Sequence, residues 1–171
     1  MGRTKMTEQG ERYVHLNSCI WDLNSAWRLL KKLKSTRRNS LVGVAFKYAL
    51  IEYSRPYKFS CGTVLGPKNK PIWHKLDQAH IPPTHVSLHK DILHARDKIL
   101  GHSDLTVKES SLHVSDSSHG RDVCVGGNVI HGTELFPQID AIIKLIEGTL
   151  ESMYKEEAIL KELLPVAKQM A

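Results

Sequence analysis

The sequence predicts an all-α protein folded as an antiparallel four-helix bundle. Apolar residues recur at helical spacing in four segments, and clusters of proline, glycine or polar residues separate these segments. The length of 171 residues suits one domain around one hydrophobic core. We therefore expect a single domain over residues 1–171, with its core at about 14–164. No apolar run approaches the roughly 20 residues that span a bilayer.

The first two helices are predicted from their apolar positions. The first buries one stripe, spaced alternately four and three residues apart: Leu16, Ile20, Leu23, Trp27 and Leu30. Trp21 lies near this stripe, so we expect core positions for both tryptophans. The second helix covers 41–54, with Asn39 or Ser40 as its cap, and is apolar on nearly every face, which predicts a central place in the bundle.

The segment 56–83 contains five prolines and no sustained period, so we expect a long irregular connection between the second and third helices. Trp73 could stack on a base or anchor this connection to the core together with Ile72, and we favour the anchor. Thr84 is the expected N-cap of a third helix from about 85 to 100, which ends at Gly101.

A short β-hairpin is expected inside an insert at 103–132, before the last helix. Alternation of apolar and polar residues and a Gly-Gly turn predict it. Thr133 is the expected cap of the last helix, which carries an apolar stripe as far as Leu164.

The charge distribution is uneven. The net charge is +6, and six of the basic residues lie between Arg28 and Arg38, where there is no acid. Such a cluster attracts a polyanion such as RNA, or it is simply a solvated helix end whose cations favour the helix dipole. The cysteines (Cys19, Cys61 and Cys124) are scattered and odd in number, which is typical of free thiols in a reducing cytosol. We therefore expect a cytoplasmic protein.

One segment combines residues suited to phosphate chemistry. Arg96 is permanently charged, and His102 exchanges a proton near neutral pH. Because a helix that breaks at Gly101 lets His102 fold back beside Arg96, the two side chains would share one site. Asp97 would then orient one of them. The alternative is structural, with Arg96 and His102 capping a polar helix end.

The segment Arg96-Asp97-Lys98-Ile99-Leu100-Gly101-His102, followed by Ser103-Asp104, resembles the signature of the HEPN superfamily, and abortive-infection members in particular. That signature is an arginine followed after four to six residues by a histidine, often with Asn, Asp or His directly after the arginine. The order of the predicted helices is also similar to that of HEPN proteins.

The resemblance implies a homodimer in which two motifs face each other across a cleft. Catalytic members are metal-independent endoribonucleases that leave a 2′,3′-cyclic phosphate. Arg96 would then bind the phosphate oxygens, His102 would move a proton and Asp97 would orient. Ser103 and Asp104 could assist. Glu52, Tyr53 and Arg55, at the end of the second helix, would approach the motif.

A HEPN-like ribonuclease suggests a defence or toxin–antitoxin setting with RNA as substrate, a cognate antitoxin as partner and no cofactor. The alternative function is a non-catalytic module that binds another protein or a nucleotide, as in inactive members. A third possibility is a metal site, because His85 and His89 stand four residues apart on one helix. That pair lacks the glutamate of a zinc protease, so the metal site is the weaker interpretation.

Overall fold

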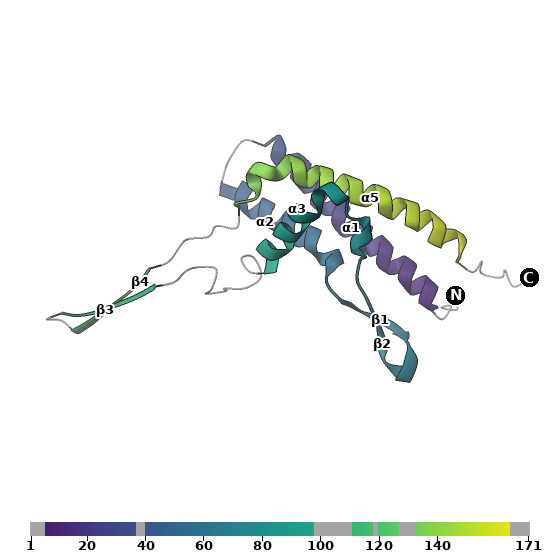
Figure 1. Ribbon diagram of the computed structural model, residues 1–171, viewed down its shortest axis with the longest axis horizontal. Coiled ribbons are helices and arrows are strands. Elements are labelled where there is room, and N and C mark those ends of the chain that lie inside the picture. Colours follow the sequence, from purple (N-terminus) through teal and green to yellow (C-terminus); the bar gives the residue numbers. More distant parts are fainter. Residues whose placement is uncertain (1–5, 37–39, 98–110, 118–119, 127–132, 165–171) are drawn as a thin grey trace, which may run out of the picture.

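The computed structural model describes residues 6–36, 40–97, 111–117, 120–126 and 133–164. These residues form a group of α-helices and two separate antiparallel sheets of two strands each. The protein is therefore a helix-rich α+β protein, and the prediction of an all-α four-helix bundle is wrong. Figure 1 shows the helices lying together, with the first sheet (β1 and β2) projecting from the bundle beside α1.

The core lies between three helices: α1 (Glu8–Lys34), α2 (Ser40–Ser54) and α5 (Ile139–Glu162). α1 is the central element because it packs against both α2 and α5. Its predicted stripe is buried at Leu16, Ile20, Leu23 and Leu30. The prediction of core tryptophans is wrong for Trp21, which is 71% exposed. Trp27 is half-buried at the edge of the core, where its Nε1 donates to Glu147.

The third helix is shorter than the sequence predicts. α3 covers Val86–Ala95, and Arg96 and Asp97 follow in a π turn. Thr84 is not the N-cap, because Pro83–His85 form a 3-10 turn and His85 takes the cap position. The predicted end at Gly101 lies outside the described residues.

The last helix also differs from its predicted bounds. Thr133 does not cap it, because a 3-10 turn at Phe136–Gln138 precedes the first residue of α5. Pro137 lies in this turn, where its missing N–H costs nothing. The helical hydrogen bonding then runs to Glu162, two residues short of the predicted end.

The segment predicted as an irregular connection contains a β-hairpin. β1 (Ser60–Leu65) pairs with β2 (Pro71–His74), with Ser60 opposite His74 and Cys61 opposite Trp73. Because side chains alternate along a strand, Trp73 lies on one face of the hairpin and its neighbours Ile72 and His74 lie on the other. Ile72 and His74 are half-buried, whereas Trp73 is 60% exposed. The predicted anchoring role of Trp73 is therefore wrong.

Glu11, a buried carboxylate of α1, fixes this hairpin to the bundle. Its Oε1 accepts hydrogen bonds from the backbone N–H and the hydroxyl of Thr63 and from the N–H of Val64, and its Oε2 lies 3.0 Å from His74 Nε2. Gly62 allows this close approach, because a Cβ there would lie 2.5 Å from Glu11 Oε2 and 2.7 Å from the Ile72 carbonyl oxygen. The hairpin is thus held by one polar cluster at its base.

A second hairpin lies inside the segment predicted as an insert. β3 (Ser111–Ser117) pairs in register with β4 (Gly120–Gly126). Its apolar side chains Leu112, Val114 and Val123 are all more than half exposed, and Figure 1 shows these strands standing apart from the helices. Among the described helices, none combines the length and the apolar character that a membrane crossing requires.

Candidate functional site

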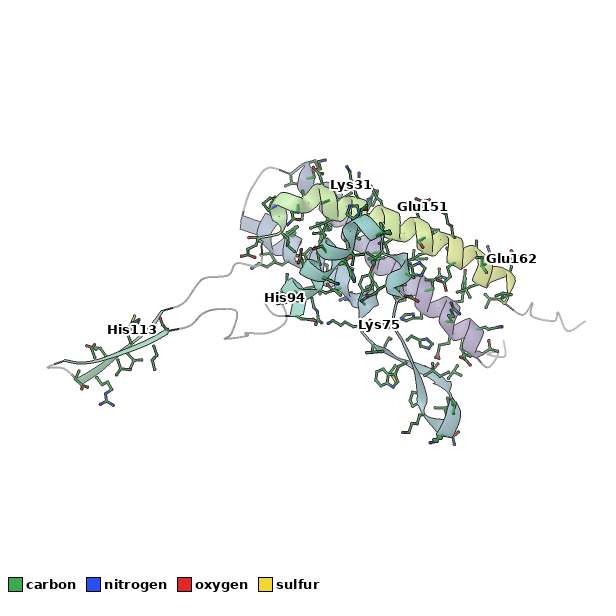
Figure 2. The ribbon with its side chains drawn as sticks, in the orientation of Figure 1. Lys31, Lys75, His94, His113, Glu151 and Glu162 are labelled. Carbon is green, nitrogen blue, oxygen red and sulfur yellow. The ribbon has the colours of Figure 1, made fainter. Side chains whose placement is uncertain are left out.

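The candidate site lies where α3 ends beside the start of the first hairpin. The carboxylate of Asp97 binds two cations there. Arg96 Nη1 donates to Asp97 Oδ1 over 2.7 Å, and Lys58 Nζ lies 2.7 Å from Oδ1 and 2.6 Å from Oδ2. Figure 2 shows His94, near the end of α3, on the side of the bundle from which the hairpin emerges. The structure therefore joins two predicted site residues to a third, Lys58, from 39 positions earlier.

Two cations and one carboxylate leave this cluster with one net positive charge, which attracts an anion. The Lys58 hydrogen bond lowers the pKa of Asp97 more than burial raises it, and the Arg96 hydrogen bond lowers it further. Asp97 is thus ionised at neutral pH and holds both cations close together. All three side chains are between 32% and 41% exposed, so solvent and ligands reach them. Two adjacent cations in this arrangement can bracket the non-bridging oxygens of a phosphate.

Four other predicted residues of the motif, Gly101, His102, Ser103 and Asp104, lie outside the described residues. Asp97 does contact Arg96, as the orienting role requires. The proton-transfer role of His102 stays a prediction.

The predicted approach of Glu52, Tyr53 and Arg55 to the motif stays a prediction, and the structure shows other polar contacts for them. Arg55 Nη1 lies 2.7 Å from Glu52 Oε1 and 3.8 Å from Asp22 of α1. Tyr53 is buried in the core, where its hydroxyl lies 2.7 Å from His89 Nδ1. Within the described part of the chain, none of these contacts joins the three side chains to Arg96 or Asp97.

The alternative metal site at His85 and His89 finds no support. His89 is buried and shares its Nδ1 with Tyr53, while His85 Nδ1 lies 2.9 Å from Thr84 Oγ1. Burial, helped by the charges of Lys75 and Lys90, lowers the pKa of His89 to about 4. Among the described residues there is also no group of three or more His, Cys, Asp or Glu that could hold a metal ion.

Two lysines of the basic cluster at the end of α1 are paired with acids. Lys34 Nζ lies 2.6 Å from Asp140, and Lys31 Nζ lies 3.4 Å from Glu147 and over the ring of Trp27. The acidic α5 therefore neutralises part of this cluster. This pairing favours the interpretation as a solvated helix end over an RNA surface.

Lys58 is the residue of the candidate site that sequence reasoning missed. No local pattern marks it, because its partner is distant in the chain; only a correct prediction of the hairpin would have drawn attention to it. Comparison of the chain with protein-family models, with curated proteins and with solved structures finds no match. The function must therefore be argued from the site itself.

Proposed function

We propose that this protein binds RNA and cuts it without a metal ion, as HEPN-like endoribonucleases do. The observation that carries the proposal is the pair of cations, Arg96 and Lys58, on the single carboxylate of Asp97. The motif alone carries the resemblance to HEPN proteins, since the fold is not the plain helical bundle that the resemblance implied. A site of this kind stabilises the charge that builds on a phosphate during transfer.

In the proposed reaction the RNA 2′-hydroxyl attacks the adjacent phosphorus. His102 takes the proton of that hydroxyl, a bond forms from O2′ to phosphorus, and the bond from phosphorus to O5′ breaks. The leaving O5′ receives a proton from solvent, and His102 releases the proton it took to solvent, so the products are a 2′,3′-cyclic phosphate and a 5′-hydroxyl. Arg96 and Lys58 hold the non-bridging oxygens, while Asp97 keeps the two cations in place until the phosphate arrives.

The proposed setting is cytoplasmic defence of the abortive-infection or toxin–antitoxin type, with a homodimer as the active form and a cognate antitoxin as its partner. The three cysteines support the reducing compartment, since all of them are free and Cys61 and Cys124 are exposed. The homodimer is supported by α2, whose outer face exposes Leu41, Val44 and Tyr48 at helical spacing.

Cleavage of an end-labelled single-stranded RNA in EDTA tests the proposal. We expect Arg96→Ala and His102→Ala each to abolish cutting with an unchanged circular dichroism spectrum. Lys58→Ala should slow cutting by about 100-fold to 1000-fold, the range for loss of one group that stabilises transition-state charge. Arg28→Ala, an exposed arginine of α1, is the matched control and should cut normally.

Two results would contradict this assignment. Full RNA cleavage by both the Arg96 and the His102 variants would show that these residues do not form the catalytic site. If the wild-type protein binds RNA through Arg96 but never cuts it, the protein is a non-catalytic binding module and not a ribonuclease.

A further inference from the structure

The outer face of the first hairpin exposes aromatic side chains on both strands. Phe59, next to the start of β1, is 70% exposed, and Trp73 of β2 is 60% exposed. The pairing of Ser60 with His74 places Phe59 opposite Lys75, and Lys75 Nζ indeed lies 5.4 Å from the centroid of the Phe59 ring. Because Cys61 pairs with Trp73, Trp73 lies two residues from Lys75 on the same face and two pairs along from Phe59. We call Phe59, Trp73 and Lys75 the aromatic platform.

The whole hairpin carries one sign of charge. Residues 58–76 include Lys58, Lys68, Lys70 and Lys75 and no aspartate or glutamate. Lys68 and Lys70 are exposed at the tip, where Lys68 and Asn69 adopt positive φ angles of 62° and 53°. Among the described residues, Asp97 binds Lys58 at the base of the hairpin, and Glu11 is buried beneath the other face, where Thr63, Val64 and His74 satisfy it. The outer face therefore presents only positive charge.

The platform is joined directly to the candidate site. Lys58, which binds Asp97, is the residue before Phe59 in the chain. Figure 2 shows Lys75 where the hairpin meets the bundle, on the same side as His94 of α3. A chain of nucleotides that lies on Phe59 and Trp73 would thus pass beside Lys58 and Arg96.

A small cavity lies at the foot of the platform. It has a volume of about 180 Å³, and Trp73 and Lys75 of the platform line it together with Arg12, His15, His74 and Glu156. Glu156 is already engaged by Arg12 at 2.6 Å and by His80 at 2.8 Å. The cavity is large enough for a phosphate group and has Lys75 at its edge.

From these observations we infer that the first hairpin is the surface that binds unpaired nucleotides of the RNA substrate. Bases stack on Phe59 and Trp73, and the lysines contact the phosphates. Aromatic side chains between cations are the common solution for single strands, because every base has a face that can stack. A duplex keeps its bases stacked on each other, so it cannot use the platform. This inference rests on the proposed function, since it names the form of RNA that the site receives.

Binding to a labelled oligouridylate of 2′-O-methyl nucleotides tests the inference, because this probe has no 2′-hydroxyl and cannot be cut. We expect the single strand to bind more tightly than a 2′-O-methyl duplex in fluorescence anisotropy. Trp73→Ala should weaken binding by about 5-fold to 150-fold, the range for loss of one stacked base, and Trp73→Phe should restore most of it. The double change Lys68→Glu and Lys70→Glu should weaken binding and lower its dependence on salt concentration.

Two matched controls separate the platform from general effects. Trp21→Ala removes a tryptophan of α1 that is even more exposed than Trp73, and the double change Lys144→Glu and Lys161→Glu alters the net charge by the same amount on α5. Both should bind like the wild type. Because all these side chains are exposed, melting temperatures should stay within a few degrees.

The outcomes distinguish failure of the inference from failure of the proposed function. Wild-type protein that cuts RNA while the Trp73 and lysine variants bind normally would overturn the inference alone. Wild-type protein that neither binds nor cuts RNA would overturn both, and it would leave the basic hairpin as a surface for an acidic protein. The inference would also be overturned if Trp21→Ala and Trp73→Ala weakened binding of the single strand equally.

Discussion

At the scale of the residue, burial in the core keeps the side chains of Tyr53 and His89 uncharged. Burial raises the pKa of the Tyr53 hydroxyl and lowers the pKa of His89 to about 4. The hydroxyl therefore keeps its proton, and its oxygen lies 2.7 Å from Nδ1 of a neutral imidazole. The other ring nitrogen, Nε2, has no hydrogen-bond partner in the described residues. Tyr57 packs against the same imidazole, with the ring centroids 4.5 Å apart.

This pair predicts a loss of stability in mild acid. The unfolded chain binds a proton to His89 near pH 6.5 and the folded protein only near pH 4, so stability falls as the pH drops through this window. The free energy of unfolding should fall by about 3 kcal/mol between pH 7 and pH 4 because of His89. Urea unfolding at several pH values checks it. In His89→Gln the dependence on pH should flatten, while His94→Gln, at an exposed position of the same helix, is the control. If the free energy of unfolding depends on pH in the same way in His89→Gln and in the wild type, His89 is not the source of the acid sensitivity.

At the scale of the element, the hairpin of β1 and β2 depends on Glu11. Burial alone would raise the pKa of this carboxyl, but hydrogen bonds from His74, Thr63 and Val64 lower it to about 2. The carboxylate therefore stabilises the hairpin fully above about pH 4.5, and this contribution disappears as the pH falls towards 2. One ionised side chain of α1 thus sets the position of the platform beside Asp97.

We predict that Glu11→Ala loosens the hairpin while the helices stay folded. The amides of Thr63 and Val64 lose their acceptor, so their hydrogen exchange should accelerate by about 10-fold to 100-fold, equivalent to 1.4–2.8 kcal/mol of local stability. Amides in the middle of α1 and α5 should exchange as before. Glu8→Ala, at an exposed position in the same first turn, is the control. Unchanged exchange at Thr63 and Val64 would show that the hairpin does not need this anchor.

The elements also show what the sequence could and could not predict. The stripe of α1 and the extent of α2 follow from periodicity, because each helix buries residues that lie close together in the chain. β1 and β2 escaped detection because their alternation is short, prolines interrupt it and the register shifts between Cys61 and Leu65. The contact of Lys58 with Asp97 joins positions that only the folded hairpin brings together. Arg96 and Asp97, by contrast, were found because both belong to one continuous motif.

At the scale of the whole molecule, α2 exposes apolar side chains on its outer face as well as burying those on its inner face. Its inner face packs in the core through Val42, Phe46 and Leu50, yet Leu41, Val44 and Tyr48 on its outer face are between 51% and 70% exposed. A helix that is apolar on both faces is typical of a buried position. A second copy of the chain would cover this outer face, and α2 also contacts α3, which ends directly before Arg96. We propose that a dimer through α2 brings the two motifs towards each other.

This arrangement predicts that dimerisation and cleavage are lost together. Val44→Asp places a carboxylate in the proposed interface, where burying an unpaired charge costs several kcal/mol. Light scattering should show a dimer for the wild type and a monomer for the variant, whose RNA cleavage should fall to background. Its binding of the 2′-O-methyl single strand should persist, because the platform belongs to one protomer. Val14→Asp, at a position of α1 that is 53% exposed, is the control and should remain dimeric and active. A monomeric Val44→Asp protein with full cleavage activity would mean that one motif suffices, and a wild-type monomer that cuts RNA would lead to the same conclusion.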